Sequence, residues 1–282
     1  MYFGIDIGGT TMRVAAFGNR DSAKEFARQD LPSTRSFSDD LLTLVTAINE
    51  LTPEGQTVQG IGLGVAGKVD GHRATLVGAG NLDGWVEQPI WREMTARFDC
   101  PVVLGNDAEA AGMAEALYGH GPEMAEDFWF IIWGTGVGGC LVRRRDPGWD
   151  PFPGEPGHQM VATLRSKIRC GCGQENCLEA YVGGQGIDKY YGRPAEQLSP
   201  NEWERVVIDL SGGVRNLVTI QPTPHVVFGG GIANKRPELL DEVAERLKDD
   251  LVVVPPPRIR LSKLGEDTGC VGALALLGLV DT

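Results

Sequence analysis

The chain is poor in positive charge and in aromatic residues, and it has no long apolar run. Its 26 Lys and Arg are outnumbered by 38 Asp and Glu, which gives a formal net charge of −12. This balance disfavours nucleic acid or an anionic membrane as a partner. The longest nearly uncharged apolar run, Cys270 to Val280, is too short to cross a bilayer. Because Met1 to Ile5 also lacks the features of a secretory signal, we expect a cytoplasmic protein.

Cysteine is scarce as well, and its distribution is uneven. Of six cysteines, Cys170, Cys172 and Cys177 lie in one short segment, and the other three are expected to be small buried side chains. In a cytoplasmic chain such crowding favours metal ligation over disulfides. With His158, the three thiols supply the ligands that zinc accepts in a closed tetrahedral site. We therefore predict a structural zinc site, the alternative being unligated thiols.

Glycine is abundant, and it marks two strand–turn–strand patterns. The first runs from Tyr2 to Phe17 and the second from Phe128 to Val142. Glycine-rich turns can present several backbone N–H groups to a phosphate, although ordinary hairpins share the pattern. Asp6 adds a carboxylate that could hold Mg²⁺. The candidate phosphate-binding residues are Asp6, Gly8, Gly9, Thr10 and Thr11, then Gly134, Thr135, Gly136 and Gly138, and in a third turn Gly229, Gly230 and Gly231.

One glycine pattern is rejected. Gly62-x-Gly64-x-x-Gly67 matches the dinucleotide-binding motif, but that motif requires a helix to begin on its glycines. The residues that follow, Lys68 to His72, resemble a turn. Helices are expected instead at Ser38–Leu51, with Ser38 as its cap, at Ala108–Tyr118 and at Pro237–Asp250.

Asn106 and Asp107 follow a predicted buried strand and precede a predicted helix. In an open α/β sheet, ligands bind where strands end in this way. A carboxylate there can accept a hydroxyl proton as the oxygen attacks a phosphoryl group, although Asp107 could also be only a helix cap. The repeated strand and turn pattern predicts two α/β domains built on one plan, with a boundary near Gly105.

In chain order, six blocks resemble the ROK family (repressor, open reading frame, kinase) of the actin-like ATPase superfamily. The resemblance covers nearly the whole chain, and six blocks in one order are more specific than any single motif. The blocks are Gly4–Thr10, Gly105–Ala108, Gly134–Gly139, Glu155–His158, Cys170–Glu179 and Gly229–Ala233.

The resemblance implies an actin-like ATPase (ribonuclease H-like) α/β fold with a central cleft and a zinc knuckle. Residues 1–105 would form one domain, completed by a C-terminal helix at about 268–282, and residues 106–267 the other. The implied activity is an ATP-dependent hexose kinase that transfers the γ-phosphate to the C6 hydroxyl. ATP, Mg²⁺ and structural Zn²⁺ are the implied cofactors, and a homodimer is the expected assembly.

The resemblance also assigns roles to individual residues. Asp107 matches the family's catalytic base. The stretch from Asn81 to Trp85 is similar to one in glucokinase-like members and favours glucose over N-acetylmannosamine, N-acetylglucosamine, mannose or fructose. The implied sugar-binding residues are Gly67, Asn81, Asn106, Asp107, Glu155, His158 and Glu179, with His158 also a zinc ligand.

The chain departs from the family pattern at several points. Trp133 replaces a small hydroxyl residue before the second turn, Asn176 replaces a glycine, and the interval from Glu179 to Gly229 is short. Two alternatives to a kinase are a sugar-responsive repressor and a non-catalytic sugar-binding protein. Repressors of the family carry a DNA-binding domain ahead of the first turn, whereas three residues precede Gly4 here, so we do not expect DNA binding.

Overall fold

The computed structural model describes residues 1–70, 75–78, 82–146, 148–161, 167–265 and 268–280. The chain divides into two compact units. The first consists of Met1–Pro122, Arg145–Asp150 and Asp267–Thr282, and the second of Glu123–Arg144 and Pro151–Glu266. The C-terminal segment thus belongs with the first unit. That unit also extends beyond Gly105, where we placed the boundary, because helix α3 (Asp107–Tyr118) packs on helix α9 (Thr268–Leu276).

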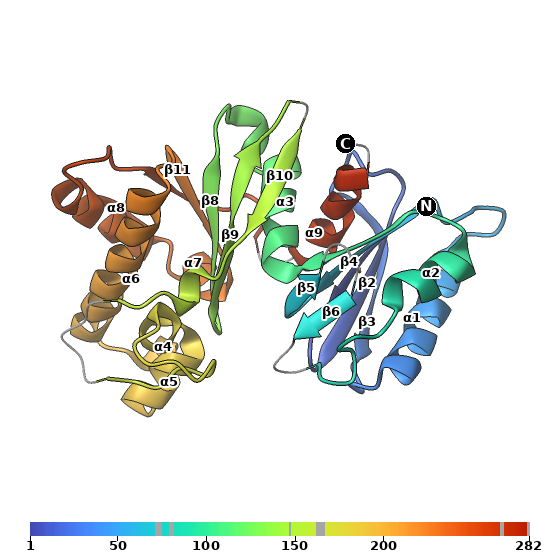
Figure 1. Cartoon of the computed structure of the whole chain (residues 1–282), viewed down its shortest axis with the longest axis horizontal. Coiled ribbons are helices and arrows are strands. Elements are labelled where there is room, and N and C mark those ends of the chain that lie inside the picture. The colour runs from blue at the N-terminus through green and yellow to red at the C-terminus, as the bar shows by residue number, and fades with distance from the viewer. Residues whose placement is uncertain (71–74, 79–81, 147, 162–166, 266–267, 281–282) are drawn as a thin grey trace. The chain divides into compact units, whose positions relative to one another are not determined.

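The first unit contains a five-stranded mixed sheet in the order β3-β2-β1-β4-β7 (Figure 1). Strands β1, β4 and β7 are parallel, and β2 is antiparallel to both β1 and β3. The strands are β1 (Tyr2–Ile7), β2 (Thr11–Phe17), β3 (Glu25–Pro32), β4 (Gly60–Val65) and β7 (Val102–Asn106). A separate two-stranded sheet is formed by β5 (Lys68–Asp70) and β6 (Thr75–Gly78).

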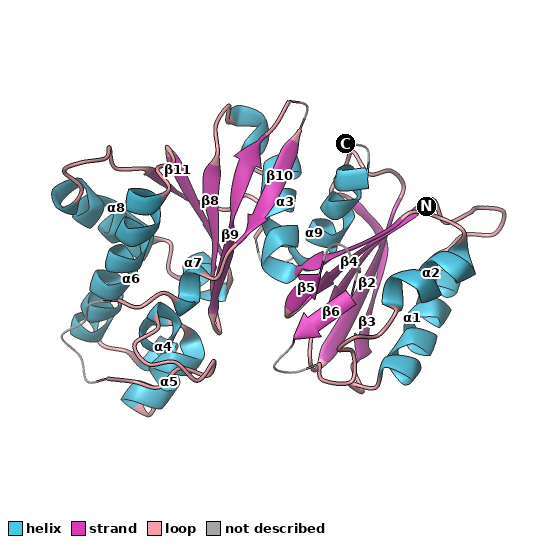
Figure 2. Ribbon diagram, viewed as in Figure 1, coloured by secondary structure: helices cyan, strands magenta, loops and turns pink. Residues whose placement is uncertain are grey.

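Helices cover both faces of this sheet, with α3 and α9 on one face and α1 (Phe37–Leu51) and α2 (Ile90–Phe98) on the other (Figure 2). Helix α9 packs very closely, because Cβ atoms added at Gly4 and Gly62 would lie 2.0 Å from the Cys270 carbonyl oxygen and 1.7 Å from that of Ala273. Gly62 therefore serves helix–sheet packing. Since strand β5, and not a helix, follows Gly67, the rejection of the dinucleotide motif is confirmed.

The second unit repeats the plan, as the two glycine turns predicted. Its sheet has the order β10-β9-β8-β11-β12, with β8 antiparallel to β9 and parallel to β11. The strands are β8 (Phe128–Trp133), β9 (Val137–Arg144), β10 (Trp149–Pro153), β11 (His225–Gly229) and β12 (Arg258–Leu261). The helices are α4 (Leu178–Val182), α5 (Gly184–Tyr191), α6 (Pro200–Ile220), α7 (Gly231–Lys235) and α8 (Glu238–Asp250), with 3₁₀ turns η2 (Pro156–His158) and η3 (Ala195–Gln197). The 3₁₀ turn η1 (Gly121–Glu123) crosses the boundary between the units, and η4 (Leu277–Val280) lies in the first.

All three helices with predicted bounds start one residue away from expectation, and α3 begins at Asp107 instead of Ala108. Helix α1 begins at Phe37, so Ser36 and not Ser38 occupies the cap position, and its side chain makes no capping hydrogen bond. Helix α8 begins at Glu238, with Pro237 preceding it. Cap positions shift by a residue or two because several neighbouring polar residues can end the preceding loop.

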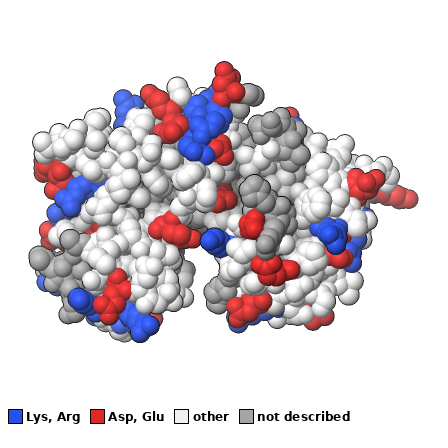
Figure 3. All heavy atoms as spheres, viewed as in Figure 1, with Lys and Arg blue, Asp and Glu red and all other residues white. Residues whose placement is uncertain are grey.

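The face of the molecule drawn in Figure 3 carries both kinds of charge. On the face drawn in Figure 3, acidic and basic side chains are interspersed, and most of the visible surface belongs to neither kind. Among the helices of the described residues, none is both long and apolar enough to span a bilayer.

Candidate active site and metal cluster

Three predicted site segments of the first unit lie at the same edge of its sheet. Strand register pairs Ile7 with Val65 and Val65 with Asn106. The carboxyl ends of three parallel strands therefore lie side by side, as expected where an open α/β sheet binds ligands. This edge brings together the turn after Asp6, the backbone of Gly67, and the Asn106–Asp107 pair.

Asn106, and not Asp107, caps helix α3. The Asn106 side-chain oxygen accepts hydrogen bonds from Ala108 N at 2.8 Å and Glu109 N at 3.4 Å. Its amide nitrogen donates to the Gly67 carbonyl at 2.8 Å, which fixes the neighbouring loop. The exposed Asp107 occupies the first helical position, and one carboxylate oxygen accepts from Ala108 N at 2.9 Å. The capping role is thus filled without Asp107.

The first glycine turn is closed by its own backbone. Gly8 N–H donates to the Thr11 carbonyl at 3.0 Å. Its N–H group is therefore already used, and its contribution to phosphate binding would be the close approach that a residue without a side chain allows. The carbonyls of Gly9 and Thr10 accept from Arg35 Nε at 2.8 Å and from Ser33 N at 3.1 Å. These contacts hold the turn from outside and provide both carbonyls with hydrogen-bond donors.

Asp6 stands at the end of β1 beside this turn. Its carboxylate accepts from Arg13 at 3.0 Å. Burial raises the pKa of Asp6 above its ordinary value, and the Arg13 guanidinium opposes that shift. A divalent cation placed here would favour the ionised carboxylate further, so the residue fits the predicted Mg²⁺ role.

In the second unit, the second and third glycine turns adjoin one another. Gly229 pairs with Ile132, which places both turns at one sheet edge, and a Cβ at Gly134 would lie 3.4 Å from Gly231 N. A pocket of about 380 Å³ opens beside them. It is lined by Gly134, Thr135, Gly184, Gln185, Asp188, Pro194, Ala195, Glu196, Gly231, Ile232 and Lys235.

Two predicted glycines have other surroundings. Gly138 lies within strand β9, opposite Ile132, and not at the tip of the turn. Gly230 has φ 91° and precedes helix α7, so it takes a conformation that favours glycine. Both remain candidates by motif alone.

Much of the pocket wall was not found from the sequence. Helix α5 and the turn η3 lie in the short interval between Glu179 and Gly229, ahead of α6, and contribute Asp188 and Glu196. Lys235 of α7 lies 3.3 Å from Glu196 across the wall. These residues form no motif, since they come together only through packing.

Trp133, a departure from the family pattern, is fully buried. Its Nε1 donates to the Val182 carbonyl at 2.8 Å, and its ring makes edge contacts with Trp203 and Phe228. The residue therefore fixes the end of β8, immediately before the second glycine turn.

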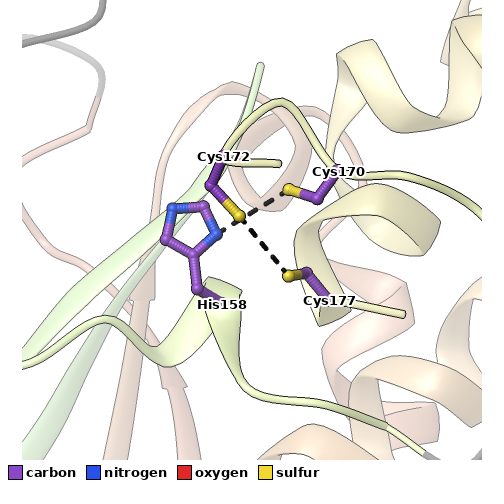
Figure 4. A group of neighbouring side chains, drawn as sticks. All are labelled: His158, Cys170, Cys172 and Cys177. Carbon is purple, nitrogen blue, oxygen red and sulfur yellow. Dashed lines mark hydrogen bonds between the residues drawn. The ribbon is translucent and has the colours of Figure 1, made fainter. Parts of the chain in front are cut away.

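The structure brings the four predicted metal ligands together (Figure 4). The ligand atoms of His158, Cys170, Cys172 and Cys177 all lie within 4.8 Å of one another. Cys172 and Cys177 have sulfurs 3.7 Å apart, and Cys170 Sγ lies 3.8 Å from His158 Nδ1. Thiolates bound to one tetrahedral zinc ion at about 2.3 Å have sulfurs about 3.8 Å apart. The donor set and its spacing therefore fit zinc.

The thiols of the cluster differ in acidity. Burial, followed by its thiol neighbours, raises the pKa of Cys177 to about 12. Burial also raises the pKa of Cys170, whereas a backbone hydrogen bond from Gln174 lowers that of the exposed Cys172. Three such thiols repel as thiolates, and a divalent cation compensates their charge.

The predicted sugar-binding residues of the second unit surround this cluster. Glu155 is exposed, and its carbonyl accepts from His158 N at 3.0 Å. Glu179 accepts from Val137 N at 2.9 Å and lies 3.6 Å from Cys170 Sγ. Asn81, the residue that favoured glucose, lies outside the described residues.

A family model described as the ROK family matches residues 2–278. An N-acetyl-D-glucosamine kinase of Escherichia coli O127:H6 is 31% identical over an alignment of 313 positions, which covers all of both chains.

Two solved structures share the fold. A ROK hexokinase from Thermus thermophilus superposes with a TM-score of 0.75 at 25% identity and covers 100% of this chain and 99% of its own. A ROK family glucokinase from Streptomyces griseus, in complex with glucose and AMPPNP, has a TM-score of 0.76 at 24% identity and covers 98% of both chains.

Proposed function

This chain belongs to the ROK family, and from that premise we propose that it is an ATP-dependent hexose kinase with Asp107 as its catalytic base. The observation that carries the proposal is the position of Asp107. It is exposed at the edge of the sheet that also presents the Asp6 turn and Gly67, while Asn106 caps the helix in its place. A carboxylate at this edge could accept the proton of a substrate hydroxyl.

In the proposed reaction, a sugar hydroxyl attacks the γ-phosphorus of ATP and ADP leaves. Asp107 accepts the hydroxyl proton as the new bond forms. Phosphoryl transfer needs mainly alignment and compensation of charge. Asp6 would hold Mg²⁺, which supplies that compensation when bound. The turns at Gly8–Thr11 and Gly134–Gly136 would bind the phosphates, and the sugar would contact Gly67, Asn106, Glu155, His158 and Glu179.

A nucleoside triphosphate is the proposed phosphoryl donor. The pocket beside Gly134 and Gly231 carries two carboxylates, Asp188 and Glu196, and one ammonium, Lys235. Carboxylates accept hydrogen bonds from the hydroxyls of ribose, whereas they repel a polyanion such as inorganic polyphosphate. The crystallised Streptomyces griseus relative holds the ATP analogue AMPPNP, which supports the same donor class.

N-acetyl-D-glucosamine and glucose are the first two sugars to compare as substrates of this chain. The 31% identical Escherichia coli relatives are N-acetyl-D-glucosamine kinases, which supports the N-acetylhexosamine alternative as well as it supports a hexose kinase in general. A single pocket contact separates such sugars by only about 1–3 kcal/mol.

The substrate proposal is tested by a panel of sugars with ATP and Mg²⁺, read by ADP release. The panel contains glucose, mannose, fructose, N-acetylglucosamine and N-acetylmannosamine, and a sugar-free reaction serves as control. We expect one of these sugars to raise ADP release well above the control. ADP release no higher than the control with every sugar of the panel would contradict the kinase proposal and favour a non-catalytic sugar-binding protein.

We further propose that the cluster at His158 holds one structural zinc ion. Four protein ligands leave no position for a reacting water, so the ion would order its loop and take no chemical step. Protein purified without chelator should contain one zinc per chain by elemental analysis. A Cys177→Ser variant should lose it, whereas Cys140→Ser, a buried thiol outside the cluster, should keep it.

A further inference from the structure

The segment that leaves the metal cluster contacts the second glycine turn. From Cys177, a cluster ligand, the chain enters α4 and then α5. We call Glu179–Gln185 the clasp segment and Trp133–Val137 the turn segment, and both lie in the second unit. The hydrogen bonds between them run from Trp133 Nε1 to Val182 O at 2.8 Å, from Val137 N to Glu179 Oε2 at 2.9 Å, from Gly184 N to Gly134 O at 2.9 Å, and from Gln185 N to Thr135 O at 2.9 Å.

The two segments are also packed without free space. A Cβ at Gly136 would lie 2.5 Å from Glu179 Oε2, and a Cβ at Gly183 would lie 3.2 Å from the Gly136 Cα. Two acceptors of the clasp segment, the Val182 carbonyl and the Glu179 carboxylate, and two of its backbone N–H groups, those of Gly184 and Gln185, therefore hold the turn segment from one side. It cannot move independently of the clasp segment, because close-packed interiors transmit displacement.

Glu179 connects this contact to the metal ligands. One of its oxygens accepts from Val137 N, and the other lies 3.6 Å from Cys170 Sγ and 4.0 Å from His158 Nδ1. The first backbone N–H of α4, from Leu178, donates to the Gln159 carbonyl at 2.9 Å, next to His158. The clasp segment thus begins two residues after one residue of the cluster, Cys177, and its first side chain lies near two others, Cys170 and His158.

We propose that metal binding at this cluster sets the affinity of the turn segment for nucleotide phosphates, with Glu179 and Trp133 as the positioning residues that couple the two sites. The inference rests on the proposed zinc site and kinase function. Its physical basis is that a structural metal supplies folding free energy to the loop that binds it. Without the ion, Cys177, which precedes the clasp segment, would no longer be held by a metal bond. The clasp segment would then be less ordered, and its hydrogen bonds to the turn segment would be weakened.

Linkage makes the coupling measurable from both sides. If zinc strengthens nucleotide binding by a given factor, the nucleotide must strengthen zinc binding by the same factor. The first experiment measures the Kd of Mg²⁺-AMPPNP by calorimetry, with zinc-loaded and chelator-stripped full-length protein and with zinc content determined on the same samples. We expect the stripped protein to bind at least about fivefold more weakly. Zinc retention against a competing chelator should rise with AMPPNP by the same factor.

A matched pair of variants separates coupling from general loss of structure. Trp133→Phe keeps a buried ring but deletes the donor to Val182, whereas Trp129→Phe deletes an indole bond to the Gln221 carbonyl elsewhere on β8. With zinc bound, Trp133→Phe should weaken AMPPNP binding and reduce the effect of zinc removal. Trp129→Phe should match the unsubstituted chain in both.

The possible failures are distinguishable. If the protein holds no zinc, the metal proposal and this inference fail together. If zinc is bound but its removal leaves the Kd of AMPPNP unchanged, or if the two Trp variants behave alike, the coupling alone is wrong. If AMPPNP does not bind the zinc-loaded protein, the inference fails along with the kinase proposal.

Discussion

At the scale of single residues, Asn106 and Asp107 divide two tasks. The Asn106 amide caps α3 and donates to the Gly67 carbonyl, whereas the Asp107 side chain is exposed. A sequence can show that two polar residues follow a strand, but it cannot show which one caps the helix. The division follows from the extended backbone of Asn106, with φ −68° and ψ 149°, which directs its oxygen at the N–H groups of the first turn.

Also at the residue scale, Asp188→Asn should raise the KM for ATP by about tenfold while kcat changes little. The carboxylate lines the pocket beside the glycine turns, and a hydrogen bond to a charged acceptor contributes about 1.5–3 kcal/mol. Steady-state kinetics at saturating sugar gives both constants. Asp249→Asn, an exposed acid of α8 outside that pocket, is the control. Equal KM values for the two variants would remove Asp188 from nucleotide binding.

Residue-level reasoning predicted the four cluster ligands and the glycine turns, because each belongs to a compact motif with a chemical reason. It did not account for Trp133, which replaces a small hydroxyl residue. The structure shows that its indole bonds to Val182, forty-nine positions further along the chain. Contacts of such long sequence separation are set by packing, and a single sequence carries no periodic signal for them.

At the scale of elements, helix α6 begins with a capping box. Ser199 N and Ser199 Oγ donate to Glu202 Oε2, both at 2.8 Å, and Arg193 also contacts this carboxylate. Backbone and side-chain hydrogen bonds from Ser199, followed by Arg193, lower the pKa of Glu202 to about 2 from an ordinary value near 4.5. Because the folded-state pKa is depressed, the stabilisation is present above about pH 4.5 and is lost as the pH falls toward 2.

Glu202→Gln should therefore reduce the urea midpoint of unfolding at pH 7, and the difference from the unsubstituted chain should narrow as the pH falls below about 4.5. Glu204→Gln, on the same helix, removes an exposed pair with Arg246 and is the matched control, with a small expected effect. A deficit in Glu202→Gln that stays constant across this pH range would contradict the assigned role of its carboxylate.

A second element-level prediction concerns helix α9. Gly62→Ala would place a Cβ 1.7 Å from the Ala273 carbonyl oxygen, so the helix must move or the strand must shift. We expect a loss of about 1–3 kcal/mol in the free energy of unfolding. Gly212→Ala in α6, where nothing lies within 4 Å of the added carbon, should be neutral or stabilising by up to about 1 kcal/mol. Denaturant unfolding of both variants measures the difference, and similar values would contradict the packing assignment.

At the scale of the whole molecule, two units share one sheet plan, with strands β1 and β8 each followed by a glycine turn and an antiparallel partner. The repeat of the glycine pattern predicted this duplication. The extent of each unit was harder to predict, because α3 is covered by α9 from the far end of the sequence. The pocket wall built from α5, η3 and α7 was missed for the same reason, since its residues meet only after folding.

Of the residues proposed to act in the kinase reaction, Asp107 and Asp6 belong to the first unit, and those of the pocket beside Gly134 and of the cluster at His158 belong to the second. The most direct test of this account is the turnover of Asp107→Asn, measured by ADP release with the best sugar of the panel, alongside calorimetric binding of that sugar. The account predicts a fall in kcat of about 10²–10⁴-fold with sugar affinity retained. A variant that turns over as fast as the unsubstituted chain would contradict it.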